Sequence, residues 1–271
     1  MSRDRRRMRA SGRVSAGLAA MAIALGTGSL AHAKIAVRYE ETKLGELVKT
    51  AAHDLDPIIR YVEFNVPAVS NIGVVVKDCD EVNASYDPAA KRLTFCYELV
   101  RYLAQNASKL FANVPDVPDD EVGDAFHQGM FYAFGHEVGH AYDYLSGLMD
   151  SEDTADKMAT YLLWSVKIDE GSAVGGLVFY EIDRADDEED LWDEHTPDKK
   201  RLANLACWSY GANPEATKDL LVAVSERIGG KKGMERRAER CEGEWLQIKR
   251  FGDKAVRFKR SEIEQAEKAA K

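Results

Sequence analysis

Apolar residues recur at helical spacing along most of this chain, and a strand-like pattern appears in a single short stretch. Apolar positions three and four residues apart predict a helix over residues 40–63, kinked or divided at Pro57, and another over residues 98–111. Between them, residues 72–76 and 92–97 are rich in β-branched and aromatic side chains and predict two strands, either a hairpin or neighbours in one sheet. This order predicts an α+β fold in which a small β-sheet precedes a mainly helical half.

The helical half begins with the longest predicted helix, residues 119–145. A second amphipathic helix is predicted over residues 151–167. Further helices follow, joined by turns at residues 211–214 and 229–233, before a charged tail that starts near residue 254. The first of these helices has an apolar stripe that anchors it in the core, made of Phe126, Met130, Phe131, Phe134, Val138, Ala141 and Leu145.

The first 33 residues have the features of a secretory signal peptide. Six arginines precede an apolar run over residues 16–25, and Ala31-His32-Ala33 forms a small-x-small cleavage pattern. The apolar run is too short for a permanent membrane span, and no later segment approaches ~18 consecutive apolar residues. We therefore expect a single domain over residues 34–271, exported to the periplasm or secreted, with no stable membrane span.

Charge and cysteine content narrow the class further. Without the leader the chain has 31 basic and 45 acidic residues, a net charge of -14, which disfavours nucleic acid and anionic membranes as partners. Four cysteines remain, and an even number in an exported chain indicates disulfides. Of the three possible pairings we favour Cys79 with Cys96 and Cys207 with Cys241. Each pair is close in sequence, and the first would lie on neighbouring strands.

Residues 136–140 read His-Glu-Val-Gly-His, an H-E-x-x-H motif on the longest predicted helix. Because a helix turns about 100° per residue, His136 and His140 lie on one face, one turn apart, and can bind the same metal ion. Glu137 lies beside them, where a carboxylate acts as the general base of zinc hydrolases. The motif predicts a Zn²⁺ site with His136 and His140 as ligands and Glu137 as a catalytic residue.

A catalytic zinc ion needs a third protein ligand. In one subclass this ligand follows the motif at position 146, but Asp143 and Ser146 stand where that pattern requires glycine and a histidine or aspartate, so it is excluded. On the next predicted helix, Glu152 and Asp156 are one turn apart. This spacing favours Glu152 as the metal ligand and Asp156 as the acceptor of a hydrogen bond from a ligand histidine. Asp153 and Asp156 stay open as rival ligands.

The remaining histidines are sorted by their place along the chain. His127 falls on the opposite side of the motif helix, and His53 lies in a helix whose pattern indicates packing. His195 follows the core helices in a loop, where it is a candidate to stabilise the oxyanion formed during catalysis. Tyr142 and Tyr144 are alternatives for that role, and a solvent-exposed loop histidine is the non-functional interpretation of His195.

Several short segments accompany these residues: Asn83-Ala84-Ser85-Tyr86-Asp87-Pro88, Cys96-Tyr97-Glu98-Leu99, Glu152-Asp153 with Asp156, Trp192 with His195, and Cys207. Together with the H-E-x-x-H motif they resemble an exported bacterial family of unknown function whose members are described as metallopeptidases. The resemblance spans roughly residues 70–245. It implies a zincin-like fold of the gluzincin type and zinc-dependent peptidase activity. The implied ligands are His136, His140 and Glu152, with Glu137 as acid/base.

The leading interpretation is an exported zinc metallopeptidase that hydrolyses peptide bonds of a protein or peptide substrate with Glu137 as general base. The alternative is a secreted zinc-binding module with a zincin fold and no turnover. Glu137 argues against that alternative, because a site that only binds metal needs no general base. A third interpretation is a disulfide-stabilised helical protein in which the motif is accidental and no metal binds.

Overall fold

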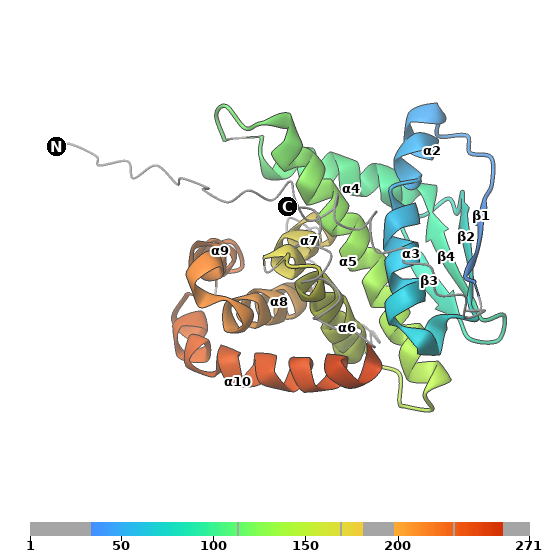
Figure 1. Ribbon diagram of the computed structural model, residues 1–271. Coiled ribbons are helices and arrows are strands. Elements are labelled where there is room, and N and C mark those ends of the chain that lie inside the picture. The colour runs from blue at the N-terminus through green and yellow to red at the C-terminus, as the bar shows by residue number, and fades with distance from the viewer. Residues whose placement is uncertain (1–33, 113, 169, 181–197, 230, 257–271) are drawn as a thin grey trace, which may run out of the picture. The chain divides into compact units, whose positions relative to one another are not determined.

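The computed structural model describes residues 34–256, apart from residues 113, 169, 181–197 and 230 (Figure 1). This part of the chain combines one four-stranded mixed sheet with a mostly helical remainder, which confirms the α+β class. Within it, no helix combines the length and apolar character needed to cross a membrane. The predicted signal peptide and the end of the charged tail lie outside the described residues, so the predicted domain limits stay a prediction.

The sheet has the strand order β1-β2-β4-β3. β1 (Ala36–Tyr39) and β4 (Arg92–Cys96) both run parallel to β2 (Gly73–Lys77), which lies between them. β3 (Ala84–Asp87) pairs with β4 in antiparallel fashion, as a hairpin. The two strands expected from the sequence are therefore parallel neighbours. β1 and β3 were not expected, because they are four residues long and have no continuous buried face.

The predicted helix 40–63 is divided in two, α2 (Glu46–Ala52) and α3 (Leu55–Asn65). Pro57 lies in the first turn of α3, where its missing N–H removes no helical hydrogen bond. α3 leads through the 3₁₀ turn Pro67–Val69 into β2. The proline thus starts a second helix instead of kinking a single one.

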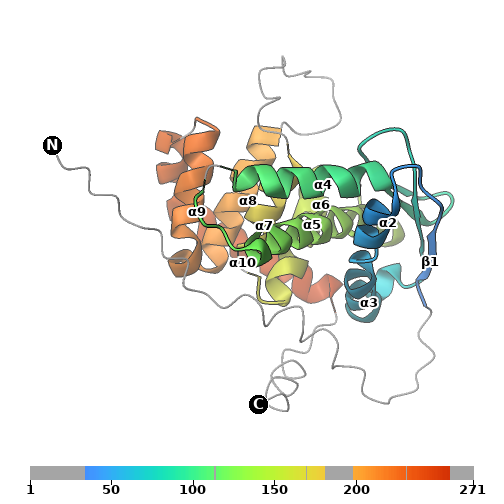
Figure 2. The ribbon, with the colours of Figure 1, turned by 90° about the horizontal axis from the view of Figure 1, so that it is seen from above.

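The helical half is organised around α5 (Asp119–Leu145), which packs against elements on both of its sides. In Figures 1 and 2, α5 lies between the sheet with α2 and α3 and the group α8 to α10. α5 makes its most extensive contacts with α6 and α7. The other helices are α4 (Tyr97–Leu110), α6 (Glu152–Ser165), α7 (Gly171–Phe179), α8 (Asp198–Ala212), α9 (Pro214–Arg227) and α10 (Lys231–Ala255).

Close packing of α5 on α6 depends on small residues. A Cβ atom at Gly139 would lie only 2.5 Å from the Cα atom of Ala155, and one at Gly135 would lie 3.1 Å from the Cα atom of Ala159. Gly139 costs roughly 1 kcal/mol of helix propensity relative to alanine, and this contact is the reason a glycine fits there. The two helices therefore approach each other at the level of the H-E-x-x-H motif.

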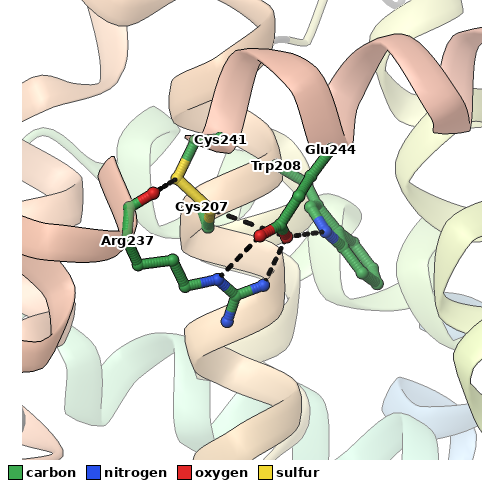
Figure 3. The surroundings of a disulfide bond; sticks show 5 residues. All are labelled: Cys207, Trp208, Arg237, Cys241 and Glu244. Atoms are coloured by element: carbon green, nitrogen blue, oxygen red, sulfur yellow. Dashed lines mark hydrogen bonds and ion pairs between the residues drawn. A yellow bond between two sulfur atoms is a disulfide. The ribbon is translucent and has the colours of Figure 1, made fainter. Parts of the chain in front are cut away.

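Two disulfides join the predicted cysteine pairs. Cys79, just after β2, bonds to Cys96, the last residue of β4, with their Cα atoms 5.5 Å apart. Cys207 on α8 bonds to Cys241 on α10, with a Cα separation of 5.1 Å. Figure 3 shows the second bond between the two helices. One disulfide thus ties the sheet and the other ties the last helices.

Candidate metal centre

The two histidines of the motif present the same ring nitrogen to one point. α5 places His136 and His140 one turn apart, and their Nε2 atoms lie 3.0 Å from each other. His136 is 5% exposed, because α5 is anchored by a fully buried stripe that includes Met130 and Phe134. The histidine pair is therefore held by the hydrophobic core, as a metal site requires.

Glu152 brings a carboxylate to the same point from α6. Its Oε2 atom lies 3.2 Å from His136 Nε2, and its Oε1 atom lies 3.5 Å from His140 Nε2. The first turn of α6 is fixed by Ser151, whose hydroxyl accepts a hydrogen bond from the N–H of Thr154. A tetrahedral zinc ion with bonds of about 2.0–2.1 Å separates its ligand atoms by about 3.3 Å. The two nitrogens and the carboxylate fit such an ion.

The second ring nitrogen of each histidine is held by an aspartate. His136 Nδ1 lies 2.9 Å from Asp156 Oδ1, and His140 Nδ1 lies 2.7 Å from Asp150 Oδ1. An ionised carboxylate can only accept, so each Nδ1 donates, and in the neutral ring each Nε2 has a lone pair for a metal. Asp150 was missed by the sequence reasoning, because it lies in the loop before α6 and shares no helical spacing with the motif.

Arg201 also belongs to the site, although no sequence motif predicted it. From α8 its Nη1 atom lies 2.9 Å from Glu152 Oε2, and its Nε and Nη2 atoms donate to the two oxygens of Asp156 at 2.9 and 2.7 Å. Arg201 is 4% exposed, and the ring of Tyr180 lies 4.8 Å from its guanidinium carbon. The sequence offers only an indirect indication of Arg201: two carboxylates one helix turn apart that become buried need a cation nearby.

The rival ligands point elsewhere. Both oxygens of Asp156 accept from Arg201, and Oδ1 also accepts from the hydroxyl of Tyr132 at 2.5 Å. Asp153 lies near the surface, where it forms an ion pair with Lys157. Of the three acidic residues at the start of α6, Glu152 is the one whose oxygens approach both Nε2 atoms.

A family model supplies the class of protein. The model described as "Putative metallopeptidase" matches residues 39–251. The chain belongs to this family. The matched segment contains every residue of the site described above. No curated protein and no solved structure is significantly similar to the chain.

At this site of the metallopeptidase family member, neighbouring charged groups change one another's pKa values. Burial alone would lower the pKa of His136, but the hydrogen bond to Asp156 and the pairing with Glu152 outweigh burial and raise that pKa to about 9. Burial would raise the pKa of Glu152, but His136 and Arg201 outweigh it and lower the pKa to about 2. In the metal-free protein at neutral pH, the site therefore holds ionised carboxylates and a charged His136.

Glu137 differs from the other acidic residues of the site. It is 6% exposed, and its carboxylate lies within 4.8 Å of a ring nitrogen of His136 and of a ring nitrogen of His140. Burial raises the pKa of Glu137 above its usual range, and the neighbouring His136 and His140 offset only part of this effect. A carboxylate with a raised pKa beside a metal site is a stronger base than an exposed one.

The other candidates from the sequence are a loop histidine, two tyrosines and a further histidine on α5. His195 falls outside the described residues. The ring of Tyr142 packs on Phe251 of α10, with ring centroids 5.7 Å apart, and Tyr144 is 52% exposed. His127 Nε2 lies 3.1 Å from Asp54 Oδ2, on the side of α5 that faces α3.

A second group with metal-ligating atoms, Cys79, Cys96 and Glu98, is structural. The two sulfurs are bonded to each other. The Glu98 carboxylate accepts hydrogen bonds from the backbone N–H groups of Cys79 and Asp80 at 2.9 and 3.0 Å. These contacts fix the turn that follows β2.

Proposed function

We propose that this chain is an exported zinc peptidase of the gluzincin type, with a zincin-like fold. His136, His140 and Glu152 are the metal ligands, and Glu137 is the general base. The observation that carries the proposal is the approach of both Glu152 oxygens to the two Nε2 atoms, at 3.2 and 3.5 Å. Membership in a metallopeptidase family supports the reaction class.

The chemistry divides between the ion and the chain. His136, His140 and Glu152 would hold a zinc ion, which would polarise the scissile carbonyl and lower the pKa of the attacking water. Glu137 takes a proton from that water and delivers it to the leaving nitrogen of the peptide. Its raised pKa suits both steps, because the carboxylate is a stronger base before the transfer and stays protonated long enough to act as an acid. His195 keeps its place as a candidate for the oxyanion.

The edge of the sheet offers a place for an extended peptide. Among the described strands β3 pairs only with β4, so its other side has backbone groups available for a further strand. β3 packs against α5, and Tyr86 of β3 lies near Tyr144 of α5, with ring centroids 6.4 Å apart. A peptide added to β3 would run beside the helix that carries the motif.

Export is part of the proposal. Residues 1–33 form the cleaved leader, and residues 34–271 form a single peptidase domain. Two disulfides support an oxidising compartment, since such bonds are rare where thiols are kept reduced.

The decisive experiment compares metal content and peptide cleavage in the mature chain and three variants. Wild type should hold about one zinc per chain and cleave members of a peptide library. Glu137→Gln should keep the metal and lose about 10²–10⁴-fold in kcat/KM. Glu152→Ala should lose the metal. Asp153→Ala is the matched control, because Asp153 is the neighbouring acidic residue and pairs with Lys157 at the surface.

The outcomes separate the interpretations. Zinc binding without cleavage of any peptide supports the zinc-binding module instead of the enzyme. Absence of stoichiometric metal in wild type overturns both. If Asp153→Ala loses zinc and Glu152→Ala keeps it, the third ligand is assigned wrongly.

A further inference from the structure

Arg201 connects two acidic side chains of α6 that have different tasks. One end of its guanidinium group meets Glu152, with Nη1 2.9 Å from Oε2. Its Nε and Nη2 atoms each donate a hydrogen bond to one oxygen of Asp156. The group also lies against the imidazole of His136, with Nη2 3.2 Å from Nδ1. Arg201 thus contacts the proposed third ligand, the orienting aspartate and one ligand histidine together.

We propose that Arg201 is a positioning residue for the metal. It holds the Glu152 carboxylate beside the two histidines and ties it to Asp156, so that the ligands are in place before the ion arrives. This inference rests on the proposed function, because it takes Glu152 as the third ligand. Arg201 does not coordinate the metal, since guanidinium nitrogens at neutral pH have no lone pair to give.

The charge balance explains why a cation is needed at this position. Asp156 is 1% exposed and the side chain of Glu152 is 15% exposed, so each carboxylate has lost most of its water. Two such carboxylates one helix turn apart repel each other and would turn away or take up protons. His136 and Arg201 together offset that repulsion, and Arg201 continues to do so when the ring of His136 is neutral.

The geometry explains why the cation is an arginine. The planar guanidinium group presents donors in a fixed fork, which allows two bonds to Asp156 and a third to Glu152 at the same time. A lysine ammonium is a single point charge on a flexible stem, and it cannot hold two carboxylates in a defined relative orientation. Partners that orient a metal ligand typically contribute about 10–100-fold to metal affinity.

The helix that carries Arg201 is anchored by contacts outside the site. Leu202, Leu205 and Ala206 follow it on α8 and are fully buried or nearly so. Cys207, less than two turns further on, is bonded to Cys241 of α10. The helix that carries the guanidinium group is therefore fixed by its own core and by a covalent link.

The test measures zinc affinity by competition with a chromophoric chelator, for wild type, Arg201→Met and Arg201→Lys. We expect Arg201→Met to weaken zinc binding by about 10–100-fold and Arg201→Lys to fall between it and wild type. The visible absorption spectrum of the Co²⁺-loaded proteins gives a second readout, because it responds to the arrangement of the ligands. It should change in Arg201→Lys, whereas a residue with a purely structural role would leave it as in wild type.

Arg237→Met is the matched control. Arg237 also grips a carboxylate with two nitrogens, at 3.3 and 2.5 Å from the oxygens of Glu244, and lies beside the Cys207–Cys241 bond instead of the metal site (Figure 3). Its loss should lower the melting temperature and leave the zinc affinity and the Co²⁺ spectrum unchanged.

The outcomes of these measurements decide whether Arg201 positions the metal ligands. Folded Arg201 variants that bind zinc as wild type does overturn the inference, and so does an equal loss of affinity in Arg237→Met. If Arg201→Met does not fold, Arg201→Lys decides by the same two readouts. A wild-type protein that binds no zinc overturns the proposed function itself, which distinguishes the two failures.

Discussion

The helix pairs α5–α6 and α8–α10 are packed by the same device and differ in what else joins them. In each pair a glycine lets two backbones meet: a Cβ atom at Gly139 would lie 2.5 Å from Ala155 Cα, and one at Gly211 would lie 2.1 Å from Cys241 O. α8 and α10 are also joined by a disulfide. α5 and α6 have no disulfide between them and are joined at this level by histidines of α5 and carboxylates of α6, of which His136 and Asp156 are buried.

The α8–α10 pair therefore contributes mainly to the stability of the fold, whereas the α5–α6 pair carries the candidate metal centre. Buried charges cost desolvation free energy that their mutual attraction repays only in part, so the α5–α6 pair stabilises the fold less than an apolar contact of the same size. The α8–α10 pair carries a covalent link. Arg201 connects the two pairs, because it extends from α8 to the carboxylates of α6.

The largest expected effect on stability is that of removing the Cys207–Cys241 disulfide. Replacing Cys207 and Cys241 with alanine should lower the free energy of unfolding by about 3–4 kcal/mol, because the bond closes a long loop of the unfolded chain. The two cysteines are 34 residues apart, against 17 for Cys79 and Cys96. Denaturant titration measures the loss. Zinc affinity should stay within a few-fold of wild type, and a large drop would show that the two helix pairs are not independent.

A glycine series compares the two contacts directly. Gly139→Ala and Gly211→Ala should each destabilise the protein by about 1–3 kcal/mol, because the added methyl group meets backbone atoms of a neighbouring helix. Only Gly139→Ala should also weaken zinc binding, since it separates the helices that carry the ligands. Gly243→Ala is the control: apart from the adjacent backbone of α10, no atom lies within 4 Å of the added Cβ, so it should stabilise α10 by about 1 kcal/mol. Equal loss of zinc affinity in both destabilised variants would contradict the comparison.

The smallest expected effect is the dependence of zinc affinity on pH. The pKa of His136 is raised to about 9 in the metal-free protein, so His136 is charged at pH 7, whereas a metal requires the neutral ring. Zinc binding should therefore release a proton, and zinc affinity should rise up to about tenfold per unit between pH 6 and 8 from this group, or about 1.4 kcal/mol. Calorimetry in buffers of different ionisation enthalpy counts the protons. An affinity independent of pH over that range would rule out a charged His136.

Local spacing accounts for the parts of the structure that could be predicted from the sequence. The helices follow from apolar periodicity, and the His136, Glu137 and His140 arrangement follows from the helical turn. The spacing of Glu152 and Asp156 favoured Glu152 as the third ligand, but it left Asp153 and Asp156 open as rivals. These residues interact with partners at most one turn away or on the next helix, so the pattern of the chain reports their positions.

Contacts between distant segments account for the parts that could not be predicted. Whether β2 and β4 run parallel depends on the path of the chain between them, which leaves no periodic trace. Asp150 extends from a loop, and Arg201 extends from a helix 49 residues beyond Glu152. Neither stands at a fixed spacing from the motif, so only the folded structure connects them with it.

The place of Arg201 along the chain also sets an order of assembly. During synthesis or translocation from the N-terminus, the H-E-x-x-H segment emerges well before α8, so a partly emerged chain contains the motif without the guanidinium group that its neighbouring carboxylates contact. The contact between His136 and Arg201 spans 65 residues, so it belongs to the long-range packing that forms more slowly than local structure. On the proposed function, the metal centre is complete only once α8 has packed against α6, so peptidase activity would begin only when most of the chain is in place.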